Sequence, residues 1–322
     1  MKLKQRSATG SDKGTPFLRL GVLVLVVGVL AFAGIYYQDQ HVNAGPSMID
    51  RQTTSAEQAV KKAPNNIGVR LELASAYRLD KRYDDELKQY AEILKADKGN
   101  RFALLGRGYA LMAKGDLTAA ATAYHKMADA TKKGEFSGAD PQLEEARYYL
   151  GSIALKQGNT KEAITQLAAA LKIQRSDSDA LYLMGVALLK EGKAQPAIDS
   201  LKQALLFVPT GWCEPQTQLA LAYATLGQVP QSTYSGAMAD FCHKKPAEAK
   251  TRLKTLVAGP VKVEALLGLA LIAQTESSNP EAVSWYQKVL TVDPNNATAT
   301  SALSRLGVAL TPTSNTTTQG PS

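Results

Sequence analysis

Residues that commonly carry out catalysis or bind metals are scarce in this chain. Its 322 residues include only three histidines and two cysteines, and the histidines lie far apart. There is no HExxH segment, no CxxC or CxxCH segment, no phosphate-binding glycine loop followed by lysine and no GxSxG turn. The adjacent Cys242 and His243 supply two ligands at most, whereas a structural metal site needs four. We therefore predict no enzyme activity, no catalytic residue, no metal site and no cofactor.

Basic residues do not form a cluster. The net charge of +8 and the pI near 9.2 raise the question of a nucleic acid or an anionic membrane surface. The lysine pairs are short, scattered along the chain and free of interleaved aromatic residues, which is typical of solvated faces rather than of a phosphate-tracking groove. They are Lys61-Lys62, Lys132-Lys133 and Lys244-Lys245. The sequence therefore predicts no nucleic-acid partner.

One long hydrophobic run stands near the N-terminus. Residues 20–37 carry no charged side chain, and as a helix these 18 residues would reach about 27 Å, close to a hydrocarbon core of about 30 Å. Five basic residues and a single acidic one precede the run, whereas Asp39 and Asp50 follow it. This positive-inside bias predicts a cytoplasmic basic tail at 1–19, a transmembrane helix at 20–37 and a chain that continues outside the cytoplasm.

A cleaved secretory signal is the competing interpretation of the same run. Ala31-Phe32-Ala33 followed by Gly34 resembles a small-residue cleavage site. We favour a retained single-pass anchor, because the apolar run continues past that site and Tyr36 and Tyr37 suit a membrane interface. Both interpretations export the remaining chain.

A fixed spacing of small residues runs through the rest of the chain. Gly108, Gly151 and Gly185 each precede a second glycine by seven residues, and an alanine follows that second glycine by five. Gly151 and Gly185 are 34 residues apart, and self-similarity at such a period signals stacked supersecondary units. Leu181, Gly185 and Leu188 would share one helix face. The second glycines are Gly115, Gly158 and Gly192, and the alanines are Ala120, Ala163 and Ala197.

This pattern resembles the tetratricopeptide repeat (TPR), whose units pair a helix A with a helix B. The resemblance covers about residues 53–308 and implies an all-α solenoid of about six helix-turn-helix units with flanking helices, after a linker at 38–52 and before a disordered polar tail at 309–322. Ala56 to Pro64 fit a lone helix B. The landmarks of the six units are, in order, Ala74, Tyr77, Tyr83 and Tyr90; Gly108, Gly115, Ala120 and Tyr124; Gly151, Gly158, Ala163 and Ala170; Gly185, Gly192, Ala197 and Pro209; Ala220, Tyr223, Gly227 and Ala239; Gly268, Ala282, Tyr286 and Pro294.

Interruptions of the period predict irregular structure. Lys81 replaces the turn glycine of the first unit, and Glu86 replaces its small alanine, which predicts loose packing there. A long loop is expected at 131–141, an additional helix at 246–256 and a two-residue insertion at Ser277-Ser278 in the sixth unit. Ala297 to Leu306 would form a terminal capping helix.

The repeat also brings the two cysteines together. Cys213 would begin helix A of the fifth unit and Cys242 would lie just past the end of its helix B, and these two ends are neighbours in an antiparallel helix pair. An exported domain lies where disulfides persist, so the resemblance implies a Cys213–Cys242 bridge. Two free buried thiols are the alternative.

In this family the A helices line a concave groove. Residue by residue, the resemblance implies an apolar, aromatic binding surface with an acidic edge at Glu145, Asp179 and Glu214. The aliphatic members could instead be covered by neighbouring helices, whereas tyrosines are common at binding surfaces. The groove residues are Phe102, Leu105, Tyr109, Met112, Tyr148, Leu155, Tyr182, Val186, Leu189 and Leu221.

The family's lysine, arginine and asparagine clamp for a C-terminal carboxylate has no counterpart here. Its positions hold residues of other types, which disfavours a chaperone-tail receptor. The expected function is a membrane-anchored scaffold or assembly factor of the cell envelope that binds a protein or peptide partner. The alternative is an accessory or regulatory subunit that docks an envelope enzyme, for example in cytochrome maturation or secretion. The clamp positions are Leu71, Ser75, Gly106, Tyr109, Glu145 and Tyr149.

Overall fold

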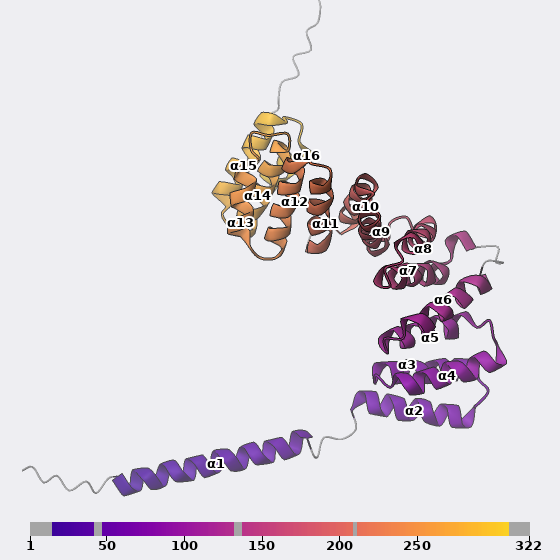
Figure 1. The fold of residues 1–322 in the computed structure, drawn as a ribbon. Helices are drawn as coiled ribbons and strands as arrows, with labels where there is room; N and C mark the ends of the chain where they lie inside the picture. The colour runs from indigo at the N-terminus through magenta and orange to yellow at the C-terminus, as the bar shows by residue number, and fades with distance from the viewer. Residues whose placement is uncertain (1–14, 42–46, 132–136, 209–210, 309–322) are drawn as a thin grey trace, which may run out of the picture. The chain divides into compact units, whose positions relative to one another are not determined.

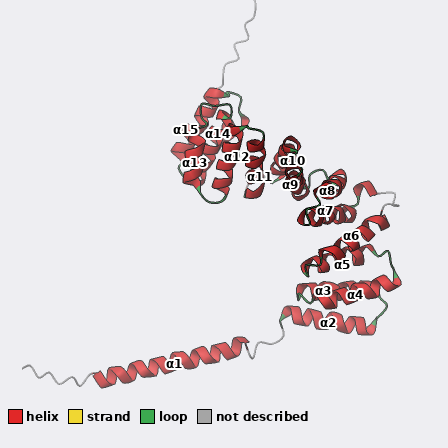
Figure 2. Cartoon of the chain, viewed as in Figure 1, coloured by secondary structure: helices red, strands yellow, loops and turns green. Residues whose placement is uncertain are grey.

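All regular structure in the described part of the chain is helical (Figure 2). The computed structural model describes residues 15–41, 47–131, 137–208 and 211–308. These residues contain sixteen α-helices and one short 3-10 helix. The all-α fold class is therefore as predicted, whereas the landmark Pro209 and the predicted tail at 309–322 lie outside the described residues.

The helices follow one another with short connections (Figure 1). They are α1 (Thr15–His41), α2 (Met48–Lys62), α3 (Ile67–Leu79), α4 (Tyr83–Ala96), α5 (Arg101–Ala113), α6 (Leu117–Thr131), the 3-10 helix η1 (Ser137–Ala139), α7 (Pro141–Lys156), α8 (Thr160–Ile173), α9 (Ser178–Lys190), α10 (Ala194–Phe207), α11 (Cys213–Thr225), α12 (Val229–Cys242), α13 (Pro246–Lys254), α14 (Lys262–Thr275), α15 (Asn279–Val292) and α16 (Ala297–Arg305).

Helix α1 contains the apolar run. Its segment Gly21–Gln38 has a mean hydropathy of 2.0, and none of it is buried within the protein. This length and composition are those of a helix that could cross a membrane, and a signal sequence shares both properties. Because α1 continues to His41 and α2 begins at Met48, both ends of the predicted linker at 38–52 are helical.

The chain divides into two compact units, residues 1–89 and 90–322. In the first unit, α2 lies against α3. The repeat pattern predicted a lone helix B in the region of α2. The Tyr77 hydroxyl donates a hydrogen bond of 2.9 Å to Glu57 of α2, and Arg82 also reaches Glu57, at 3.4 Å. The Glu86 side chain is fully buried and accepts a 2.7 Å hydrogen bond from Arg78. The alanine position of this hairpin is thus filled by a buried ion pair.

Seven helix hairpins share one turn geometry. In each, a residue with φ between 58° and 83° follows the first helix. The next residue donates its amide to a carbonyl five positions earlier, as Lys193 does to Leu188 at 2.9 Å. Glycine adopts this left-handed conformation freely, whereas other residues adopt it at a cost. The turn residues are Lys81, Gly115, Gly158, Gly192, Gly227, Lys244 and Ser277.

Replacing Lys81 with glycine is expected to stabilise the first hairpin by roughly 0.5 to 1 kcal/mol, because glycine removes the left-handed strain at a smaller entropic cost. Hydrogen exchange of the α3 and α4 amides in the full chain measures the effect as slower exchange. The matched control is Gly115→Ala, which introduces the same strain into the α5–α6 hairpin and should speed its exchange. Faster exchange in Lys81→Gly would contradict the prediction.

Helix α13 forms an extra hairpin that is half a period out of step. The turn residues Gly227 and Lys244 are 17 residues apart, so α12 is both the second helix of the fifth unit and the first helix of the next hairpin. The helix predicted at 246–256 is thus a repeat element in its own right. Ala237, Ala249 and Leu253 are fully buried and take the hairpin positions that Gly185, Ala197 and Leu201 hold in the fourth unit.

The predicted insertion at Ser277-Ser278 is wrong. Ser277 is the turn residue of the α14–α15 hairpin, with φ 61°, and Ala270 precedes it by the usual seven residues. Gly268, which the sequence pattern suggested as the landmark, instead lies against Leu253 and Met238, 3.0 Å and 3.3 Å from where its Cβ would stand. The sixth unit therefore keeps the regular spacing, with alanine in place of glycine.

The repeated glycines allow the two helices of a hairpin to cross closely. A Cβ on Gly185 would lie 2.5 Å from Leu201 Cγ and 3.3 Å from the Ala197 carbonyl, and Gly151 is equally close to Leu167. Helices α6 and α7 are joined by the long connection predicted at 131–141. It contains η1, while residues 132–136 fall outside the described part.

Candidate partner-binding groove

The predicted groove residues recur at fixed positions of the first helix of each hairpin. Tyr182, Val186 and Leu189 stand ten, six and three residues before the turn residue Gly192. These spacings place them along one side of α9, because residues three and four apart share a helix face. Helices α5, α7, α9 and α11 carry the corresponding residues of the other hairpins, and α9 contacts both α7 and α11.

Exposure separates the predicted groove residues into three groups. Phe102 and Leu221 are exposed, at 62% and 56%, whereas Leu105 and Leu155 are buried, at 7% and 9%. These two leucines belong to the core, as the alternative for aliphatic side chains predicted, and they add no surface to the groove. The half-buried residues are Tyr109, Met112, Tyr148, Tyr182, Val186 and Leu189.

The tyrosines form an aromatic cluster over α5 to α7. The Tyr109 ring lies edge-on to Tyr149 with centroids 5.1 Å apart, and Tyr149 stacks on the buried Tyr124 at 5.3 Å. Tyr148 contacts Tyr149 at 5.0 Å. Such edge-to-face and stacked pairs hold the rings in defined positions. Farther along, Tyr182 lies 5.2 Å from the Trp212 ring.

Each residue of the predicted acidic edge helps to raise the pKa of a groove tyrosine in the preceding hairpin. Burial, with a hydrogen bond to Glu145, raises the pKa of Tyr109 far above its usual range. Burial and the nearby Asp179 raise the pKa of Tyr148 to about 12. Burial and Glu214 raise the pKa of Tyr182 in the same way. The predicted groove therefore presents neutral phenols beside carboxylates. Together these groups favour a ligand that carries hydrogen-bond donors or positive charge.

Glu144, beside the predicted edge, is a buried acid that the sequence did not single out. Its exposed fraction is 8%, and its Oε1 atom has no hydrogen-bond partner. Burial and a hydrogen bond with Asp177 raise the pKa of Glu144 to about 8. Asp177 in turn caps α9 by accepting hydrogen bonds from Asp179 N and Ala180 N. Protonation removes the buried charge of Glu144 and lets this residue donate a hydrogen bond to Asp177.

The folded protein is expected to lose stability as the pH rises from about 4.5 to about 8. The pKa of Glu144 is raised in the folded state above its ordinary value of 4.5, so its contribution is complete below that pH and is lost as the pH passes about 8. Urea unfolding of the full chain at pH 5 and pH 8 measures the slope. Glu144→Gln should flatten that slope and stabilise the protein at pH 8. An unchanged slope would show that Glu144 does not titrate in this range.

The helix positions of the predicted groove residues recur on α12, outside the set that the sequence predicted. Because α12 is also a first helix, Tyr234, Met238 and Phe241 stand ten, six and three residues before its turn residue Lys244. All three are partly exposed. The sequence interpretation missed them because it assigned α12 only as a second helix; the recurrence of small residues at Ala237 and Ala249 was the signal that could have found them.

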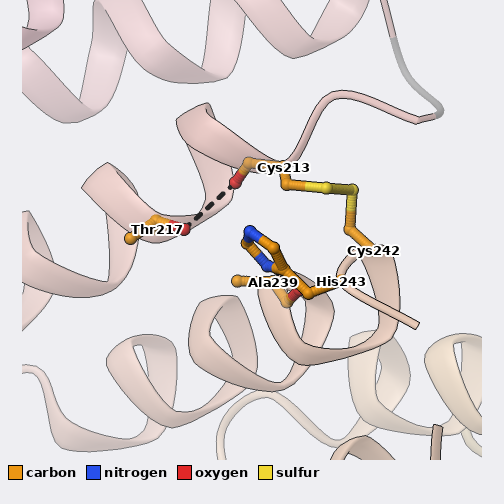
Figure 3. Close-up of a disulfide and its surroundings, with 5 residues drawn as sticks. All are labelled: Cys213, Thr217, Ala239, Cys242 and His243. Carbon is orange, nitrogen blue, oxygen red and sulfur yellow. Dashed lines mark hydrogen bonds between the residues drawn. A yellow bond between two sulfur atoms is a disulfide. The ribbon is translucent and has the colours of Figure 1, made fainter. Parts of the chain in front are cut away.

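The two cysteines form the predicted disulfide (Figure 3). Cys213 begins α11 and Cys242 ends α12, with their Cα atoms 5.4 Å apart. His243 Nδ1 lies 2.7 Å from the Ala239 carbonyl oxygen. With its sulfur in the bridge, Cys242 cannot also bind a metal. No group of three or more histidine, cysteine, aspartate or glutamate residues is placed to hold a metal ion in the part of the chain that the structure describes.

Comparisons with known proteins agree with this architecture. Residues 87–135 match the tetratricopeptide repeat family, and residues 113–204 match the family described as anaphase-promoting complex, cyclosome, subunit 3. No curated protein is significantly similar to the chain.

Several solved structures resemble parts of the chain. The crystal structure of MamA protein is 22% identical, with a TM-score of 0.50, over 56% of this chain and 94% of that one. The C-terminal part of a TPR repeat-containing protein from Cytophaga hutchinsonii is 19% identical, with a TM-score of 0.46, over 78% and 93%. YrrB, described as a TPR protein with an unusual peptide-binding site, is 17% identical, with a TM-score of 0.47, over 66% and 97%.

Three observations therefore agree. The described residues contain seven hairpins of one geometry, the small residues recur where the paired helices cross, and two family matches fall within the repeats. The solved structure of MamA protein has a similar fold. Residues 87–135 thus match a tetratricopeptide repeat, and the other described hairpins repeat the same helix-turn-helix geometry.

Proposed function

We propose that this protein is a non-catalytic scaffold that binds a partner polypeptide along the groove formed by α5, α7, α9 and α11. The observation that carries the proposal is the recurring pair of a half-buried tyrosine and a neighbouring carboxylate, at Tyr109, Tyr148 and Tyr182. Tyrosine offers rigid contact area with a polar end, and rigid contact area lowers the entropic cost of binding. The exposed Phe102 and Leu221 add apolar surface at the two ends of this row.

The acidic edge indicates the kind of partner. Asp179 and Glu214 are exposed, and each lies close enough to a groove tyrosine to raise its pKa. A segment that combines apolar side chains with lysine or arginine would complement this surface, since opposite charges steer and orient association. The proposed partner is therefore a polypeptide with an apolar and basic segment.

We further propose that the protein is held in the cell membrane through residues 20–37, with the N-terminus in the cytoplasm and the repeats outside it. The exposed apolar face of α1 and the Cys213–Cys242 disulfide support this arrangement, because disulfides persist in oxidising compartments. A reporter fused after Ser322 should work only outside the cytoplasm, and activity inside it would reverse the orientation.

Partner capture by the full chain in detergent is expected to fail in the double variant Tyr148→Ala with Tyr182→Ala. Removing two aromatic contacts should weaken binding by at least a hundredfold, which corresponds to about 3 kcal/mol. Affinity purification from envelope extracts, followed by mass spectrometry, measures which protein is lost. The control changes Lys172 and Thr165, exposed residues of the second helix α8, to alanine.

Two results would count against the proposal. Either the control variant loses the partner while the tyrosine variant keeps it, or neither variant loses it. If the captured partner is an enzyme, the protein acts as its accessory subunit; a structural or secreted partner makes it an assembly factor of the envelope.

A further inference from the structure

An apolar cavity of about 540 Å³ lies beside the disulfide, beyond the predicted groove. It is bordered by α10, α11, α12, α13 and α14, and Cys242 forms part of its wall. Its volume falls in the range of sites that enclose a large side chain or a small ligand, and its lining is mainly apolar with few polar groups. The apolar and aromatic lining residues are Leu205, Trp212, Met238, Phe241, Pro246 and Leu271.

The cavity follows from the half-period shift at α12. Met238 and Phe241 stand at the groove positions of α12, as Val186 and Leu189 do on α9, so the cavity continues the register of the groove. Trp212, which contacts the groove residue Tyr182, reaches the cavity from the α11 end. A partner that contacts Tyr182 therefore lies close to this cavity, because Trp212 touches both.

Two charged residues stand at the cavity, and they differ in their partners. Glu276 is paired with Lys250 at 2.5 Å. Lys244 has no ion pair among the described residues, and its side chain is exposed. The adjacent Lys245 does not line the cavity. One uncompensated cation at an apolar cavity favours an occupant that combines a bulky apolar group with a carboxylate.

The surroundings indicate an internal segment of a chain rather than its end. Leu271, in the lining, is 37% exposed, and Leu206 and Phe207, next to the lining residue Leu205, are 75% and 51% exposed. Exposed apolar surface is thus present in the cavity and next to it on α10, so an occupant that runs past the cavity can bury more area than one that stops there. The partner chain can then keep its backbone polar groups outside the apolar cavity.

We propose that this cavity is an anchor site for a bulky apolar side chain of the partner polypeptide, whose neighbouring aspartate or glutamate pairs with Lys244. The inference rests on the proposed function, since it places a specific contact of the same partner. It assigns to α12 and α14 a recognition role that the regular repeat pattern does not give them.

Selection of a displayed random peptide library on the full chain in detergent tests the anchor site. The peptides carry amidated C-termini when synthesised for binding measurements. We expect the selected sequences to share a bulky apolar residue close to an acidic one. Leu271→Asn should weaken their binding at least tenfold, whereas Leu226→Asn, at a similarly exposed site outside the cavity, should not.

A pair of adjacent lysines provides the matched test of charge. Lys244→Gln should weaken binding by about five- to tenfold and remove the preference for an acidic residue, while Lys245→Gln should leave both unchanged. Binding that depends on Tyr148 and Tyr182 but not on Leu271 or Lys244 would overturn the anchor site and leave the groove proposal standing. A requirement for a free C-terminal carboxylate, or no enrichment of any sequence, would also overturn it.

Discussion

Arg78→Ala should lower the free energy of unfolding of the first hairpin by about 3 kcal/mol, because it removes the guanidinium that pairs with the buried carboxylate of Glu86. The Glu86 side chain is fully buried, whereas the Arg78 side chain is 38% exposed. The charge whose burial is costly in the variant is therefore that of Glu86. Other hairpins hold a fully buried alanine at this position, as at Ala120 and Ala163. The ion pair is therefore not needed for the hairpin fold.

Glu86→Ala is the matched control and should change stability by no more than about 1 kcal/mol, since it removes the buried charge together with the need for its partner. Adding Arg78→Ala to that variant should then have little further effect. Hydrogen exchange of α3 and α4 in the full chain measures all three. Equal losses for Arg78→Ala in both backgrounds would show that the arginine acts through something other than Glu86.

Removing the disulfide is expected to cost about 3.5 kcal/mol. On the chain-entropy model, a bridge that closes a loop of about 30 residues stabilises by this amount. The variant replaces Cys213 and Cys242 with serine in the full chain, and urea unfolding in detergent measures the change. The amides of α11 to α13 should lose most protection, because the bridge joins the ends of α11 and α12.

Reduction provides the control for this change. The unmodified chain treated with a reductant should lose as much stability as the serine variant, and the variant itself should not respond to the reductant. If the reduced chain and the serine variant both unfold at the same urea concentration as the oxidised chain, the bridge does not stabilise these helices.

The sequence predicted the hairpins well because their chemistry is local. A small residue is required where helices cross, as at Gly185, and a glycine is favoured where the turn takes positive φ, as at Gly192. Both requirements repeat at 34-residue intervals and can be read without knowledge of the fold. The pairing of Cys213 with Cys242 followed from the same register.

The irregular positions could not be predicted in the same way. Lys244 and Ser277 occupy turn positions that glycine holds elsewhere, so the glycine pattern did not reveal the shared helix α12 or the true register of the sixth unit. Leu105 and Leu155 share the helix positions of the half-buried Tyr182 and Leu189, yet they are buried. Burial of a given side chain depends on its neighbours in adjacent hairpins, which spacing alone does not specify.

Site-specific photo-crosslinking tests most directly whether the first helices form the partner-binding surface. A photoreactive amino acid is placed at Tyr182 or Leu221 in the groove, or at Lys172 or Thr165 on the second helix α8, in the full chain expressed in its native cells. The account predicts that the two groove positions crosslink to one and the same protein and that the two control positions do not. Crosslinking to that protein only from Lys172 and Thr165 would contradict it.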